Sequence, residues 1–119
     1  MVTATVAVGA QPIAIELNPV TNKIYVANVN GNSVSVVDGV SNAVVATVAV
    51  GASPYAVSVN NVTDRIYVAN ASAGTVSVIS GQINSVLMSI PVGQIPVAIA
   101  INPVTNKVYV ANSGSQSVS

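Results

Sequence analysis

The chain has 119 residues, of which 51% are hydrophobic and only 5% are charged, and its formal net charge is zero. It contains no histidine and no cysteine, which excludes a Ser-His-Asp or Cys-His catalytic site and the usual ligands of zinc and haem. Phosphate neutralisation generally takes about six to ten basic contacts, whereas the chain has three basic residues, so nucleic acid is disfavoured as a partner. No stretch approaches the roughly 18 consecutive apolar residues of a membrane helix, so we expect no membrane insertion.

Short strands bounded by turn residues are predicted from the N-terminal part of the chain onward. Valine, isoleucine and threonine dominate, and they favour strands over helices. In the first predicted strand, Ile13, Ile15 and Leu17 alternate with Ala14 and Glu16, and the strand ends at an Asn-Pro turn signal. A loop rich in Gly, Asn and Ser separates the second strand from the third. The four strands are expected at 12–17, 23–28, 33–37 and 43–50.

The same pattern then recurs with a strict period of 42 residues: "IYVAN" at 24–28 returns at 66–70, and "VYVAN" follows at 108–112. A fixed period of this size indicates tandem supersecondary units, and four antiparallel strands in such a unit are typical of a β-propeller blade. A β-sandwich of about eleven short strands would also fit the alternation. Sandwich strands occupy different environments, however, and need not resemble one another at a fixed distance. We therefore predict an all-β protein with about three propeller blades.

The repeat register divides the chain into 1–8, blades at 9–50 and 51–92, and an incomplete blade at 93–119. Segment 1–8 contains "VTATVAV", which aligns with a fourth strand, so we expect it to be the outer strand of a closing blade. Propellers typically have four to eight blades, and closing one bare blade face is worth on the order of 10 kcal/mol.

The ring is therefore expected to be completed either by a longer parent chain or by head-to-tail association of copies. For the 119-residue chain alone, the favoured partner is a second copy. Such a homodimer would have six blades, and segment 1–8 of one copy would cover a strand edge of the other.

The residues "NPVTNKIYVAN", followed by a strand ending in Asp-Gly or Ser-Gly and then by "VVATVAVG", resemble the YVTN β-propeller repeat family along the whole chain. The family's tetrapeptide has Thr where this chain has Ala27, Ala69 and Ala111, and the second copy reads "NNVTDR" in place of "NPVTNK". The resemblance implies a closed ring of blades and an extracellular or cell-surface location, as in surface-layer proteins. It implies no activity by itself, because one fold carries many functions.

The acidic residues do not suggest catalysis. The chain has only three carboxylates, at Glu16, Asp38 and Asp64, and they occupy three different repeat positions, so we expect no general acid–base pair and no metal site. Glu16 lies on a first strand, which lines the channel of a propeller, and is therefore a candidate for contacting a ligand there. The simpler interpretation of Glu16 is a solvated carboxylate. Asp38, which precedes a glycine, is interpreted as a turn former and not as a Ca²⁺ ligand.

Two further sets of residues share a repeat position. Lys23, Arg65 and Lys107 stand just before each second strand, which predicts a sparse ring of cations on one rim, where solvated charge blunts strand edges. The second set is Tyr25, Tyr67 and Tyr109, at the centre of each second strand. We expect these tyrosines to pack between blades, each hydroxyl reaching a polar partner, and not to form a stacking platform.

The loop after the second strand varies most between copies, and binding residues on a rigid scaffold concentrate in such loops. Its small, uncharged polar side chains suit hydrogen bonds to a surface protein or a glycan, and they equally suit an inert solvated loop. The candidate binding residues are Asn30, Asn32, Ser72, Ser113 and Gln116.

The sequence thus predicts a non-enzymatic structural or protein-interaction propeller at a cell surface, with no cofactor. One alternative is a small-ligand or hydrolytic propeller that uses the central channel. Another is a designed or fragment propeller that self-assembles without natural activity.

Overall fold

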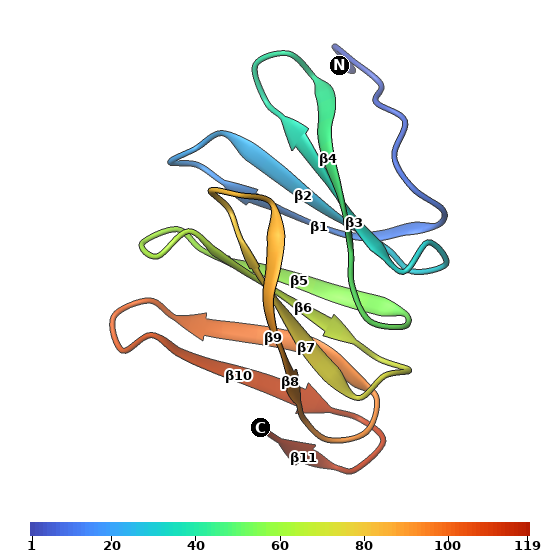
Figure 1. The fold of residues 1–119 in the computed structure, drawn as a ribbon, viewed down its shortest axis with the longest axis vertical. Helices are drawn as coiled ribbons and strands as arrows, with labels where there is room; N and C mark the ends of the chain where they lie inside the picture. The colour runs from blue at the N-terminus through green and yellow to red at the C-terminus, as the bar shows by residue number, and fades with distance from the viewer.

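The computed structural model describes residues 1–119 as three antiparallel sheets arranged in a row (Figure 1). Within each sheet the strands are hydrogen-bonded in chain order, and we call the sheets blades 1, 2 and 3. Blade 1 consists of β1 (Pro12–Asn18), β2 (Lys23–Asn28), β3 (Ser33–Asp38) and β4 (Ala43–Ala49). Blade 2 consists of β5 (Pro54–Asn60), β6 (Arg65–Asn70), β7 (Thr75–Ser80) and β8 (Ser85–Pro91). Blade 3 consists of β9 (Pro96–Asn102), β10 (Lys107–Asn112) and β11 (Ser117–Val118).

The observed strands of blade 1 agree with the predicted ones to within one residue at each end. The first strands β1, β5 and β9 are neighbours, whereas β4 and β8 barely contact each other. The blades therefore fan outward from their first strands, as blades do around a propeller axis. The structure contains no helix long and apolar enough to cross a membrane.

Residues 1–8 form an extended arm before blade 1 and pair with no strand. In Figure 1 the arm lies at one end of the row of blades and the C-terminus lies at the other end. The assignment of 1–8 as the outer strand of a closing blade therefore stays a prediction, since no strand edge in the single chain accepts it.

The turn before each second strand explains why the repeat keeps its motif. Asn22, Asp64 and Asn106 occupy this turn with φ of 56°, 53° and 57°, a left-handed conformation that Asn and Asp tolerate better than other side chains. The preceding Asn18 closes the same turn, because its Oδ1 accepts a hydrogen bond from the Val20 backbone N–H at 3.0 Å. Local turn chemistry thus fixes where each strand ends.

A glycine that opens each unit permits a close approach. A Cβ atom added at Gly51 would lie 2.8 Å from Cγ and Nδ2 of Asn70. Asn70 cannot move away, because it is fully buried and its amide donates to Thr75 Oγ1 at 3.2 Å and to Ser77 Oγ at 2.9 Å. The glycine is therefore required by packing against the last residue of the "YVAN" motif.

Replacing Gly51 with Ala is expected to lower the free energy of unfolding by about 1–2 kcal/mol, because overpacking forces buried groups to shift. Urea unfolding of the purified variant measures the loss. Gly31→Ala is the matched control, since its new Cβ would come no closer than 3.1 Å to any neighbour. Equal stability of the Gly51→Ala variant and the unchanged chain would contradict this account of the motif.

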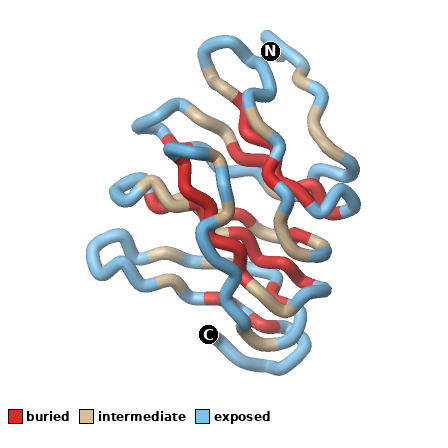
Figure 2. The backbone as a smooth tube through the Cα atoms, in the orientation of Figure 1, coloured by how far each residue is buried: buried red, intermediate tan, exposed pale blue.

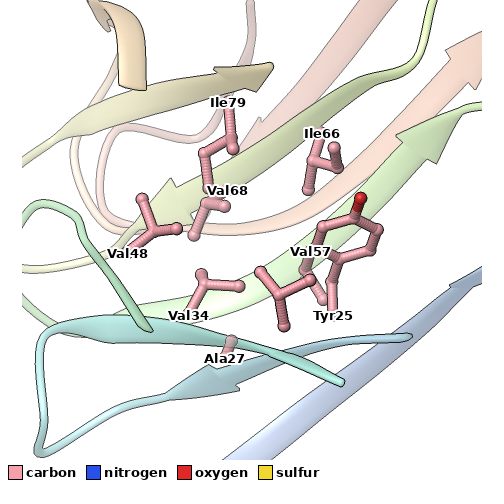
Figure 3. Packing of buried hydrophobic residues seen from close by; sticks show 9 residues of the cluster. Tyr25, Ala27, Val34, Val48, Val57, Ile66, Val68 and Ile79 are labelled. Atoms are coloured by element: carbon pink, nitrogen blue, oxygen red, sulfur yellow. The ribbon is translucent and has the colours of Figure 1, made fainter. Parts of the chain in front are cut away.

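The hydrophobic core lies between blades 1 and 2, where the backbone carries buried residues (Figure 2) and side chains of both sheets meet (Figure 3). Along β2 the side chains alternate, so that Tyr25 and Ala27 face blade 2. From the other side, β6 contributes Ile66 and Val68. The cluster consists of Tyr25, Ala27, Val34, Val36, Val48, Val57, Ile66, Val68 and Ile79.

The expected packing of tyrosine between blades is confirmed at Tyr25, which is fully buried in this cluster. The expectation that its hydroxyl finds a polar partner is wrong, because the Tyr25 hydroxyl oxygen is buried without any hydrogen bond. In this cluster the tyrosine ring packs with aliphatic residues such as Val57 and Ile66 (Figure 3).

Candidate binding surfaces

Glu16 lies in a hollow where the three first strands come together. The hollow has a volume of about 410 Å³, and β1, β5 and β9, with the turns that follow them, supply its walls. Glu16 is the only ionisable residue among them, and its carboxylate accepts a hydrogen bond from the Leu17 backbone N–H at 3.3 Å. The lining residues are Glu16, Leu17, Pro19, Val59, Asn61, Ile101 and Pro103. The structure thus puts Glu16 at the inner edge of the blades, where the first strands converge.

The other two carboxylates lie apart from each other and have different hydrogen-bond partners. Asp64 accepts a hydrogen bond from Asn18 Nδ2 at 3.1 Å and so links blade 2 to blade 1. Asp38 closes its own turn, because its carboxylate accepts from Ser41 Oγ at 2.9 Å and from the Val40 N–H at 3.3 Å. The hydrogen bond from the Ser41 side chain, followed by that from Val40, lowers the pKa of Asp38. Asp38 is therefore a turn former, as the sequence indicates.

The three cations begin β2, β6 and β10, but their contacts differ. Lys23 Nζ donates to the Gly81 carbonyl at 3.3 Å and so connects blade 1 to blade 2. Arg65 Nη1 donates within its own turn, to the Thr63 carbonyl at 3.4 Å. Lys107 is exposed and makes no hydrogen bond through its side chain. One of the three thus contributes to the contact between blades and not only to a solvated rim.

The five loop residues proposed from the sequence do not form one surface. Asn32 Oδ1 accepts from the Ser53 N–H at 3.0 Å, and Ser72 Oγ lies 2.8 Å from Ser53 Oγ, so both tie a loop to the linker between blades 1 and 2. Ser113 Oγ donates to the Ile95 carbonyl at 3.1 Å and does the same between blades 2 and 3. These three side chains therefore hold the loops against the linkers between blades, a structural role that neither the binding interpretation nor the inert-loop interpretation predicts.

The remaining two candidates differ from each other. Gln116 lines a shallow hollow of about 360 Å³ at the β10–β11 loop, together with Ser113. Asn30 is exposed on blade 1, and its side chain makes no hydrogen bond. The candidates therefore fall into three separate places along the rim.

The largest hollow lies on the rim between blades 2 and 3 and includes residues that the sequence analysis missed. Its volume is about 600 Å³, and its walls are the β6–β7 loop at 71–74, the β8–β9 linker at 92–95, and Ser115. Ser72 is the one predicted residue in it. The linker adds Gln94 and Ile95, which are exposed. The sequence does mark this linker, because the repeat changes there: residues 9–11 read "GAQ", residues 51–53 read "GAS", and residues 93–95 read "GQI".

Ile95 is unusual in its backbone conformation. Its φ is 52°, a left-handed value that is a genuine outlier for a β-branched residue. The equivalent positions hold Gln11 and Ser53, which lack a branched Cβ. Strained residues of this kind cluster at ligand-binding and switch regions, so Ile95 marks the rim hollow as the strongest candidate site for contacts.

Four-stranded antiparallel blades fanning from adjacent first strands define a β-propeller, and the chain has this fold. It is similar to hydrazine synthase of Kuenenia stuttgartiensis, with a TM-score of 0.85 and 33% identity over 94% of this chain and 32% of that one. A functionally unknown protein of Desulfotomaculum acetoxidans gives a TM-score of 0.75 and 15% identity, over 94% of this chain and 41% of that one. The β-propeller domain of Swd1 of Myceliophteria thermophila gives a TM-score of 0.74 and 13% identity, over 89% of this chain and 32% of that one.

This chain thus spans between about a third and two fifths of the length of those proteins. No family model and no curated protein matches it. Its membership of the YVTN repeat family therefore stays a prediction, whereas the propeller fold is shared with solved structures.

Proposed function

We propose that the chain belongs to a non-catalytic β-propeller that acts as a structural or protein-interaction module at a cell surface. The observation that supports this most is the rim hollow between blades 2 and 3. Ser72, Gln94, Ile95 and Ser115 line this hollow, and Ile95 is exposed. Uncharged hydrogen-bonding groups beside an aliphatic side chain suit a protein surface or a glycan. The cell-surface location rests on the resemblance to the YVTN repeats.

The side-chain chemistry favours recognition over catalysis. The chain has no histidine and no cysteine, which removes the most common general base and the thiol nucleophile. Its carboxylates are separated, with Asp64 between blades and Asp38 in a turn. Although one similar structure is named for an enzyme, hydrazine synthase, we propose a scaffolding role for this chain.

Binding to carbohydrate tests the proposed role. We expect the chain to bind at least one member of an array of cell-surface glycans and purified wall polysaccharides. Ile95→Asn should weaken that binding about tenfold, because it removes the aliphatic contact in the hollow. Asn tolerates the left-handed φ better than Ile, so the loss cannot be assigned to misfolding.

Ile83→Asn is the matched control, since Ile83 is also an exposed isoleucine, at 66% against 50% for Ile95, and lies in the β7–β8 turn. It should leave the binding unchanged. Failure of the chain to bind any probe, or equal binding by both variants, would contradict a glycan-binding role for the rim hollow.

The hollow at Glu16, where the three first strands come together, supports a second candidate, a small-ligand or hydrolytic propeller. Its single carboxylate, in a hollow with no other ionisable residue, would select a small cation. Thermal-shift measurements with spermidine and hydrolysis of p-nitrophenyl acetate test the two versions. A response that disappears in Glu16→Gln would favour this function over the rim function, and no response in the unchanged chain would remove it.

A further inference from the structure

In blades 1 and 2, one face is covered by the next blade along the chain. Tyr25 is fully buried beneath blade 2, and Tyr67 is half-buried beneath the incomplete blade 3. Tyr109, at the same repeat position of blade 3, is 47% exposed. These three positions have the same sequence context, so the difference in burial comes from the following blade. The far face of blade 3 is thus built like the other two but lacks its cover.

The opposite face of blade 1 is open in the complementary way. Val57 of β5 packs against blade 1 and is 6% exposed, whereas Ile15 at the same repeat position of β1 is 69% exposed. A hollow of about 240 Å³ on this face is lined by residues 12–15 and Val26. The two ends of the chain therefore carry the two halves of the contact that blades 1 and 2 make with each other.

Repeated hydrogen bonds give this contact a direction and a register. Asn18 Nδ2 donates to Asp64 Oδ1 at 3.1 Å. One unit later, Asn60 Nδ2 donates to Asn106 Oδ1 at 3.2 Å. The next donor is the amide of Asn102, which is exposed and has no acceptor in the chain. The matching acceptor position in blade 1 is Asn22, in the turn between β1 and β2, and its side chain is also exposed.

The N-terminal arm matches the strand that blade 3 lacks. In blade 1, β3 pairs with β4 so that Val34 is opposite Val48 and Ser35 is opposite Thr47. Blade 2 repeats this register between β7 and β8. Shifted by whole repeats, the same register sets Val6 of the arm opposite Val118 of β11. The arm and β11 lie at opposite ends of the row of blades (Figure 1), so one chain cannot make this pair with itself.

An apolar hollow marks the place of the missing strand. It has a volume of about 320 Å³ and lies between blades 2 and 3, where Tyr67, Ile90 and Val110 are among its walls. At the equivalent contact between blades 1 and 2, Val86 of β8 packs against the core. Val2 of the arm occupies the same repeat position as Val86, so an added arm would bring an apolar side chain to this hollow.

We propose that the open face of blade 3 docks on the open face of blade 1 of a second copy of this chain. In this contact Asn102 donates to the second copy's Asn22, and Tyr109 becomes buried. The second copy's arm, residues 1–8, pairs with β11 and becomes the fourth strand of blade 3. Two copies joined in this way at both ends form a ring of six blades. The proposed assembly and the proposed surface role can fail separately. Light scattering tests the assembly, and glycan binding tests the surface role.

Cysteine pairing tests both the contact and its register. The chain has no cysteine, so each introduced thiol reports on one position. We expect a mixture of Val6→Cys and Val118→Cys chains, one of them carrying a tag, to give a mixed disulfide-linked pair on oxidation. Val20→Cys replaces Val6→Cys in the control mixture, since Val20 is a 73% exposed valine in a turn. This mixture should give about tenfold less of the disulfide-linked pair. Light scattering of the unchanged chain should give twice 11.8 kDa.

A single charge on the docking face separates the proposal from simple loss of folding. Ile15→Lys should return the particle to one chain while the far-ultraviolet circular dichroism stays that of a β-sheet, because Ile15 is exposed in the single chain. Val20→Lys should leave two chains. A folded particle of one unchanged chain would overturn the proposal. A two-chain particle without the pair between positions 6 and 118 would overturn it as well, because the copies would then meet by another face.

Discussion

Replacing Ile66 with Ala is expected to lower the free energy of unfolding by about 3 kcal/mol. Ile66 is fully buried and lies in the cluster between blades 1 and 2. The change removes three carbon atoms and leaves a cavity whose walls belong to two sheets. Each sheet is held by its own ladder of backbone hydrogen bonds, so the walls cannot collapse onto the space. Urea unfolding followed by circular dichroism measures the loss as a lower midpoint with an unchanged slope.

Ile83→Ala provides the control, because Ile83 is an exposed isoleucine in the turn between β7 and β8. Its stability should stay within about 0.5 kcal/mol of the unchanged chain. If the two variants lost equal stability, the contact between blades would not be the main source of cohesion in this chain. The explanation of docking by the same kind of face would then weaken too.

The strand boundaries could be predicted from the sequence because the turn chemistry is local. Asn22, Asp64 and Asn106 stand one repeat apart in a left-handed conformation, and the residues that tolerate this conformation are few. Alternation between these turns then fixes which side chains share a face. This is why the predicted and observed strands agree so closely.

Burial could not be predicted from the sequence in the same way. Tyr25 and Tyr109 stand in nearly identical strands, yet one is fully buried and the other is 47% exposed. Their difference depends on whether a further blade follows, and no local pattern encodes that. The hydroxyl of Tyr25 likewise has no partner, because the polarity of its surroundings is set by residues of another blade.

The candidate surfaces were predicted in part. Glu16 was singled out because it stands on a first strand, and the structure puts it where first strands meet. Asn32 was proposed for binding but accepts a hydrogen bond from a linker residue 21 positions away. Contacts of this length are invisible in a pattern that is read over one strand and one turn. Gln94 and Ile95 lie in the linker between two blades, whereas the variation that points to binding residues in the sequence is in the loop after each second strand.

The covering of one blade face by another connects stability with assembly in this chain. Each face that another blade covers adds to the stability of a blade, and blade 2 alone has a blade of this chain on each side. The exposed faces of blades 1 and 3 repeat a contact that is already present twice, including its hydrogen bonds from Asn18 and Asn60. Substitutions at the covered face therefore test folding, whereas those at the open face test association.

Raising the pH is expected to destabilise the chain through the tyrosine in its core. Burial raises the pKa of Tyr25 to about 12, and the nearby negative charge of Asp64 adds to the effect. The unfolded chain deprotonates this tyrosine near its ordinary pKa of 10.0. The contribution to stability is therefore fully present below pH 10 and is lost as the pH rises through 12. At about 1.4 kcal/mol for each pH unit, the loss over this range is about 3 kcal/mol.

Tyr25→Phe separates this effect from the other titrations at alkaline pH. The Tyr25 hydroxyl is buried without a hydrogen bond, so its removal is expected to raise the free energy of unfolding at neutral pH by about 1 kcal/mol. Phenylalanine cannot ionise, so the variant should keep its stability between pH 10 and 12 where the unchanged chain loses it. Tyr55→Phe, at an exposed tyrosine, should change neither value. Urea unfolding across this pH range gives the comparison, and parallel curves for Tyr25→Phe and the unchanged chain would show that Tyr25 is not the group responsible.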